Sequence, residues 1–155
     1  AFENNGATVK ASPAAEPVRV QRFTMPQNGD WGDVLLIHPP NSVSYEVTIM
    51  DEATELYFRI AMAPESWEWG GDGSTFVVLA ETEAETAVEL LRHHISNEPA
   101  DRGWHPFTIS LAEFSGQTVT LTLTTEPGPA GDFTGDWAGW ETPRILYSRD
   151  STQQP

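Results

Sequence analysis

Residues 117–125 have the sequence QTVTLTLTT, which is the most regular alternation of apolar and polar residues in the chain. Val119, Leu121 and Leu123 alternate with threonines, so that every second side chain is apolar. Successive side chains of a β-strand point to opposite faces of the sheet, whereas an amphipathic helix repeats its apolar residues every three or four positions. Threonine and valine also favour strands over helices. The stretch therefore predicts a β-strand with one face in a core and the other in solvent.

Similar short segments recur on both sides of residues 117–125. The predicted strands cover residues 18–23, 33–38, 42–50, 55–62, 74–80, 88–95, 104–111, 117–125 and 144–147. Twelve glycines and twelve prolines supply turns between them. Residues 81–94 have a helical composition, but the context of a sandwich favours a strand for 88–95. The whole pattern predicts an all-β fold, an antiparallel β-sandwich of the jelly-roll type.

The two ends of the chain differ in composition from its body. Residues 1–17 (AFENNGATVKASPAAEP) are small, polar and proline-bearing, which is typical of a flexible arm or linker. Residues 148–155 (SRDSTQQP) have the same character and are expected to form a tail. Residues 18–147 lie between them without an internal repeat and are predicted to form a single sandwich domain.

The charge of the chain excludes several kinds of partner. The formal net charge is −15, from 23 acidic and 8 basic residues. A protein that binds nucleic acid or an anionic membrane surface needs clustered lysine and arginine, so neither is expected as a partner of this chain. No segment approaches the run of about 20 apolar residues that a membrane span needs. The 155 residues include no cysteine, which excludes disulfides, thiol nucleophiles and cysteine-based metal sites.

Three features between residue 76 and residue 140 follow one another in a recognisable order. A Phe76-x-Val78 strand comes after a glycine, and a G-x-x-V-x-L-x-L strand covers residues 116–123. Near the end, Asp136 is followed four positions later by Trp140. This order resembles the galactose-binding-like jelly-roll superfamily, and most of all the NPCBM type, a carbohydrate-binding module of bacterial surface proteins. The resemblance covers roughly residues 56–145.

Loop tryptophans are the candidate ligand-binding residues. Trp67 and Trp69 lie in a glycine-rich acidic loop, and Trp31 and Trp137 lie in two further loops of that kind. A flat indole stacks on the apolar face of a sugar ring, and polar groups around it then fix the hydroxyls. If the first loop is extended, the spacing of two places Trp67 and Trp69 on one face. The alternative is that these side chains fold back as lids over the ends of the sandwich.

Arg102 is a further candidate for ligand binding. A guanidinium forks onto a carboxylate or a pair of hydroxyls of a ligand. The alternative is an internal ion pair, which is the stronger expectation in a chain so rich in acids.

Loop aspartates are the candidate metal ligands. Calcium takes six to eight oxygen ligands from carboxylates, carbonyls and water. The resemblance implies a structural calcium between an early loop and the last strand, and Asp30, Asp132 and Asp136 are the expected ligands. The alternative is that they are solvated turn residues, since aspartate often bonds its own backbone in turns.

No motif of an enzyme is present: no GxSxG elbow, no phosphate-binding loop and no dinucleotide fingerprint. We therefore expect a non-catalytic extracellular or cell-surface module, bacterial or archaeal, that binds a glycan or polysaccharide. The alternative function is a structural or assembly module of a surface protein or filament, whose N-terminal arm pairs with a neighbouring subunit. Phe2 and Val9 favour this alternative, because apolar residues in a polar arm need a partner surface.

Overall fold

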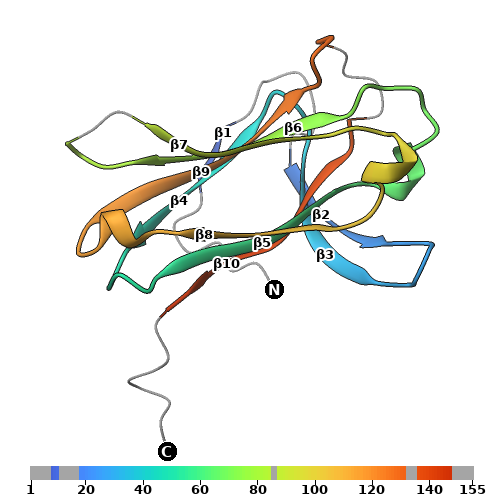
Figure 1. Cartoon of the computed structure of the whole chain (residues 1–155). Helices are drawn as coiled ribbons and strands as arrows, with labels where there is room; N and C mark the ends of the chain where they lie inside the picture. Colours follow the sequence, from blue (N-terminus) through green and yellow to red (C-terminus); the bar gives the residue numbers. More distant parts are fainter. Residues whose placement is uncertain (1–7, 11–17, 85–86, 132–135, 148–155) are drawn as a thin grey trace, which may run out of the picture.

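Two antiparallel sheets face each other in the computed structural model, which describes residues 8–10, 18–84, 87–131 and 136–147 (Figure 1). In the described residues each sheet has five strands. The first sheet has the order β1 (Thr8–Lys10), β4 (Ser42–Thr48), β9 (Thr118–Pro127), β6 (Ser74–Glu81) and β7 (Val88–Ile95). The second has the order β2 (Val18–Thr24), β3 (Trp31–Ile37), β10 (Ala138–Leu146), β5 (Glu55–Met62) and β8 (His105–Ser110). The predicted antiparallel β-sandwich is confirmed.

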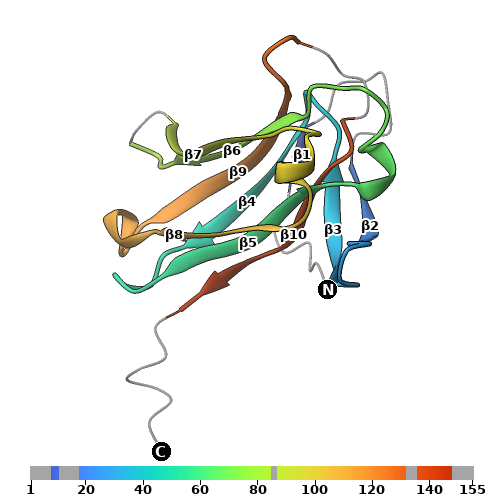
Figure 2. The same cartoon turned by 45° about the vertical axis from the view of Figure 1, so that its right-hand side comes forward.

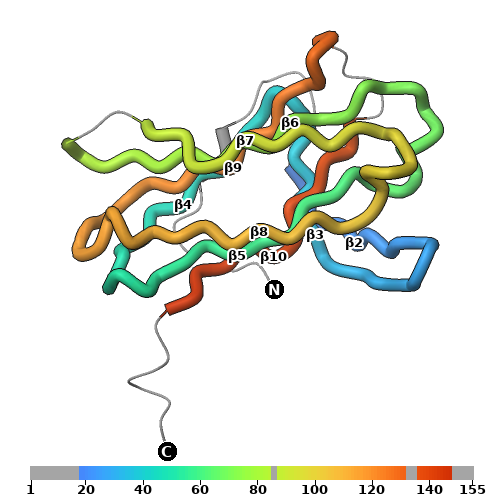
Figure 3. The backbone as a smooth tube through the Cα atoms, in the orientation of Figure 1, coloured from blue at the N-terminus to red at the C-terminus, as the bar shows by residue number. Residues whose placement is uncertain are grey.

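Short 3-10 turns connect some of these strands. They are η1 (Pro64–Ser66), η2 (Pro99–Asp101) and η3 (Ala112–Phe114). Figure 3 shows the two layers as separate groups of tubes, with β4, β7 and β9 in one and β5, β8 and β10 in the other. No helix in the described part of the chain is long and apolar enough to cross a membrane.

The alternating stretch of residues 117–125 lies in β9, at the centre of the first sheet. Val119, Leu121 and Leu123 are buried in the main core, while the threonines between them face outward. On the outer face the Thr122 hydroxyl pairs with that of Ser44 on β4 at 2.9 Å. The pattern of the sequence therefore sets which side of β9 faces the other sheet.

Aromatic rings fill the centre of the main core. Trp140 on β10 lies between Phe58 on β5 and Phe76 on β6, with ring centroids 5.2 and 5.3 Å apart. All three side chains are fully buried, and each contributes about 1.5–3 kcal/mol by leaving water. Because Phe76 comes from the first sheet and the others from the second, this stack joins the two layers.

A second apolar cluster covers the outer face of the second sheet. Val34 and Leu36 point outward from β3, while Leu35 and Ile37 point into the main core. The other buried members of the outer cluster are Phe23, Met25, Ala61 and Ala63, and Trp67, Trp104 and Trp137 pack against it. Burial on both faces explains why residues 34–37 of β3 form a continuous apolar run rather than an alternating one.

Two predicted boundaries differ from the structure. The last strand begins at Ala138, six residues before the predicted start, because β3 and β5 pair with it on either side. Gly139 lies inside this strand, and a Cβ at this position would come within 2.5 Å of the Phe23 ring, so glycine is the residue that fits there. Within the arm predicted as flexible, Thr8–Lys10 pairs with β4. The rest of the arm and the tail 148–155 lie outside the described residues.

Candidate ligand-binding site

Three segments far apart in sequence meet at one end of the second sheet. They are the turn that follows β3, the loop that follows β5 and the segment that precedes β10. The Ala63 N–H donates to the Trp137 carbonyl at 2.8 Å, which joins the second segment to the third. The ring of His38, in the turn after β3, meets Trp137 edge-on with centroids 6.2 Å apart. The views in Figures 1 and 2 show η1 and the loop after it beside the second sheet.

Trp69 and Trp137, hereafter the tryptophan pair, are brought together at this end. Their ring centroids are 4.9 Å apart and their planes are at 89°, an edge-to-face contact worth about 0.5–1.5 kcal/mol beyond area burial. Trp137 is half-buried against the outer cluster, whereas Trp69 is 47% exposed. Trp69 is therefore accessible to a ligand, while the Trp137 ring that it contacts is held by the outer cluster.

The loop after β5 places Trp69 through a series of short turns. Ser66 is buried, and its hydroxyl donates to the Ala63 carbonyl at 2.8 Å. The N–H of Trp69 then donates to the Ser66 carbonyl at 3.1 Å. Gly70 follows with φ of +83°, a conformation that glycine adopts without strain. The loop is thus coiled back on itself rather than extended.

Trp67 does not share a platform with Trp69. Its side chain is half-buried and packs against both the main core and the outer cluster. Trp67 and Trp69 were expected on one face only if the loop is extended. The loop is not extended, because turns begin at η1. This packing fits the alternative that Trp67 folds back over an end of the sandwich, and a role for Trp67 in ligand binding stays a prediction.

Arg102 has its guanidinium engaged by its neighbours. Its Nε donates to the Asn97 carbonyl at 3.1 Å and its Nη2 to the Trp67 carbonyl at 3.4 Å. Its Nη1 lies 3.0 Å from the carboxylate of Glu68, and the guanidinium carbon is 5.3 Å from the centroid of the Trp67 ring. These contacts join the loop after β5 to the one before β8. A role for Arg102 in ligand binding stays a prediction.

Trp31 lies away from the tryptophan pair. It begins β3, whereas His38, which touches the pair, follows the other end of that strand. At about 3.3 Å per residue, the length of β3 separates them by roughly 20 Å. Trp31 is 52% exposed, and the Arg22 guanidinium lies over its ring at 3.9 Å. The structure therefore divides the predicted tryptophans between two places.

The expected calcium ligands are not brought together. Asp30 precedes β3 and Asp136 precedes β10, and these strands are antiparallel, so the two carboxylates lie at opposite ends of their ladder. The Asp30 carboxylate also accepts from Arg59 Nη1 at 2.9 Å. Asp132 lies outside the described residues. Among the residues that are described, no group of three or more potential ligands has an arrangement that would hold a metal ion. The expected set of three is therefore wrong in pairing Asp30 with Asp136.

Two residues beside the tryptophan pair were missed from the sequence. The Arg19 guanidinium lies over the Trp137 ring at 5.3 Å, and His38 meets its edge. Arg19 is paired with Leu36 across β2 and β3, so it shares the outward face of the second sheet. No local motif marks either residue, because strand pairing is what carries them to Trp137.

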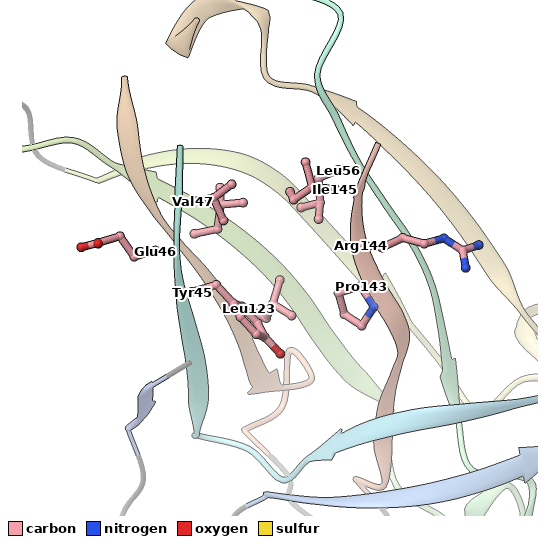
Figure 4. A pocket seen from close by; sticks show the side chains of 9 residues that line it. Tyr45, Glu46, Val47, Leu56, Leu123, Pro143, Arg144 and Ile145 are labelled. Atoms are coloured by element: carbon pink, nitrogen blue, oxygen red, sulfur yellow. The ribbon is translucent and has the colours of Figure 1, made fainter. Parts of the chain in front are cut away.

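A cavity of about 140 Å³ opens between β4 and β10, away from the tryptophan pair (Figure 4). Its walls are mainly apolar and include Val47, Leu123 and Ile145. Glu46 and Arg144 point away from the space, as Figure 4 shows. Ligand pockets usually measure about 300–1,000 Å³ and present several polar groups. The cavity is therefore poorly suited to a sugar.

No family model matches the chain. An uncharacterised protein of Archaeoglobus fulgidus is 32% identical over 121 residues, which cover 74% of this chain and 30% of that protein. The chain therefore spans less than a third of the length of this relative.

Solved structures identify the fold. The CBM51 of Clostridium perfringens GH95, solved in complex with methyl-galactose, has a TM-score of 0.52 at 11% identity over 94% of this chain and 91% of its own. TmCBM61, in complex with beta-1,4-galactotriose, has a TM-score of 0.53 and 13% sequence identity, and the match covers 95% of this chain and 97% of TmCBM61. The structure of the CBM51-2 and INT domains from Clostridium perfringens ZmpB has a TM-score of 0.57 and 11% sequence identity, and the match covers 94% of this chain and 30% of that one. The fold is the galactose-binding-like jelly roll, as the resemblance predicted.

Proposed function

We propose that this chain is a non-catalytic carbohydrate-binding module and that the tryptophan pair holds its glycan. The observation that carries the proposal is the exposed Trp69 indole resting edge-on against the anchored ring of Trp137. The shared fold supports it, since two of the similar modules were solved with galactose-containing ligands.

The proposed contact is a stack between the Trp69 face and the apolar face of a sugar ring. An indole that is already held by a neighbouring ring loses little side-chain freedom on binding, which favours affinity. Arg19 and His38 both contact the Trp137 ring of the pair. They would supply the polar contacts that fix hydroxyl groups.

The test compares two tryptophans of similar exposure at different places. Trp69→Ala should lower the affinity for a glycan identified on an array by about ten-fold or more, as removal of a stacked aromatic costs roughly 1–3 kcal/mol. Trp31→Ala is the matched control and should bind like the parent. Thermal unfolding of both variants checks that the fold is intact. Loss of binding in Trp31→Ala alone would move the site to the β2–β3 hairpin.

A structural calcium stays part of the proposal in reduced form. Asp136 is 2% exposed beside Trp137, and with Asp132 it is a candidate ligand, whereas Asp30 is bound to Arg59 elsewhere. A bound ion would raise the melting temperature by mass action, and a chelator would reverse the rise. Asp136→Asn should abolish the shift and Asp30→Asn should keep it. No shift at millimolar calcium in the parent chain would remove the calcium from the proposal.

We also propose an extracellular or cell-surface location, where a glycan ligand is accessible and an acidic surface keeps a protein soluble in salt. Protease treatment of intact cells of the source organism, followed by immunodetection, tests the location. Protection of the chain until the cells are lysed would contradict it.

The assembly function has one specific observation in its favour. Thr8–Lys10 already adds a strand to β4, but it covers only residues 42–44 of that strand. On that side residues 45–48 have no strand partner in the described part of the chain. An arm that pairs with an edge in its own chain has the capacity to pair with the same edge of a neighbour. Removal of residues 1–17 should then reduce the size measured by light scattering, and an unchanged size would end this alternative.

A further inference from the structure

The tryptophan pair is bordered by an arginine that has no carboxylate partner among the described residues. Acidic residues outnumber basic ones by 23 to 8, so most arginines of this chain are expected to form an ion pair. Arg19 forms none with any described residue. The described arginines that form ion pairs are Arg22, Arg59, Arg92 and Arg102, and the other that forms none is Arg144.

The contacts of Arg19 with the described residues fix the position of its side chain but use only one of its nitrogen donors, Nε. Its Nε donates to Gln21 Oε1 at 3.1 Å, and its guanidinium carbon lies 5.3 Å from the centroid of the Trp137 ring. Within the described part of the chain its two terminal nitrogens donate to no group. The stack on Trp137 places these nitrogens beside the ring that supports Trp69.

From this arrangement we propose that the glycan held by the tryptophan pair carries a carboxylate, as a uronic acid does, and that Arg19 binds it. This inference rests on the proposed function. The planar fork of a guanidinium matches the two oxygens of a carboxylate, and a charged hydrogen bond is about twice as strong as a neutral one.

The overall charge of −15 does not oppose such a contact at close range. At physiological ionic strength, exposed charges farther apart than about 8 Å are largely screened. A carboxylate at hydrogen-bond distance from Arg19 feels that guanidinium far more than it feels distant acids. Arg19 would therefore select an acidic sugar at a surface that disfavours anions elsewhere.

The test uses an array that holds pairs of glycans differing only in the presence of the carboxyl group, followed by calorimetry. The parent chain should prefer the acidic member of a pair. Arg19→Gln should lose about ten-fold to a hundred-fold in affinity for it and clearly less in affinity for the neutral member, so that the preference for the acidic glycan disappears. Arg144→Gln is the matched control, since Arg144 also lacks an ion pair and stacks on a ring, that of Tyr57, at 4.8 Å. Arg144→Gln should change neither affinity.

The outcomes separate this inference from the function on which it rests. Binding of neutral glycans without a preference for acidic ones, or a preference that Arg19→Gln retains, overturns the role of Arg19 and leaves the module a glycan binder. Binding that Trp69→Ala does not weaken overturns the site as a whole. A blank array with acidic and neutral glycans alike overturns both.

Discussion

Arg59 on β5 and Glu141 on β10 form a two-point salt bridge on the outer face of the second sheet. Arg59 Nε donates to Glu141 Oε1 at 2.8 Å, and Nη2 donates to Oε2 at 2.7 Å. The hydrogen bonds to Glu141 raise the pKa of Arg59 above its ordinary value, with a further contribution from Asp30. The Trp104 ring lies against the guanidinium at 4.4 Å. Through Asp30, this network ties the β2–β3 hairpin to the centre of the sheet.

Glu141→Gln should lower the free energy of unfolding by about 1–2 kcal/mol, because a charged hydrogen bond to a partly buried arginine is lost. The side chains of Arg59 and Glu141 are only 18% and 15% exposed, and Asp30 remains as a partner for the charge. Urea denaturation measures the change. Glu89→Gln is the control, since its partner Arg92 is in solvent, and it should unfold like the parent. Equal losses of unfolding free energy in the two variants would show that the partly buried pair stabilises the fold no more than the exposed pair does.

Gly73 and Gly116 have almost the same left-handed backbone but different surroundings. Their φ angles are +85° and +81°. A Cβ on Gly73 would overlap the backbone carbonyl of Ile95, whereas a Cβ on Gly116 meets nothing within 4 Å. Gly116→Ala should therefore cost only the strain of the conformation, about 1–2 kcal/mol. Gly73→Ala should cost clearly more, because backbone must move. Chemical denaturation decides, and a smaller loss for Gly73→Ala would contradict the packing of the segment after β7.

Trp140 and Thr125 share a hydrogen bond in the core, from Nε1 to Oγ1 at 3.2 Å. Trp140→Phe removes the donor and opens a cavity among fully buried side chains, and it should cost about 2–4 kcal/mol. If the hydrogen bond contributes, Thr125→Val and Trp140→Phe together should cost less than the sum of the two single changes. Strict additivity would mean that the loss comes from volume alone.

His93 predicts a pH dependence of stability. Burial lowers the pKa of His93, and the neighbouring charge of His105 lowers it further, with Asp101 opposing and His94 adding to the shift. The unfolded chain has the ordinary pKa of about 6.5 and therefore binds the proton first as pH falls. The free energy of unfolding should be fully retained above that pKa and should decrease as pH falls below it.

The measurement is urea denaturation from about pH 8 to about pH 5, a window around the ordinary histidine pKa. His93→Gln should flatten the decrease, and His94→Gln on the same strand controls for the substitution itself. Asp101 acts in a lower range: hydrogen bonds from Ser96 lower the pKa of its carboxyl, so its contribution is lost only as pH falls through values below 3.8. An unchanged slope in His93→Gln would contradict the assignment.

Local pattern was sufficient to predict most of the strands. Alternation predicted β9, and the predicted range 55–62 is the range of β5. It failed where a residue's neighbours override its usual preference. The last strand was predicted only from residue 144, whereas Gly139 already lies in β10 because β3 and β5 pair with it on either side.

Sequence alone therefore determined the class of fold and singled out loop tryptophans, because side-chain period, turn residues and loop composition are local properties. Tertiary structure alone decided that Trp69 meets Trp137 and that Trp31 lies at the other end of β3. It also decided that Arg59 binds Asp30 and that Arg19 lies beside the tryptophan pair. These relationships follow from the strand order β2-β3-β10-β5 and its registers. Pairing between distant segments is set by the packing of the whole chain, so no short stretch of residues contains it.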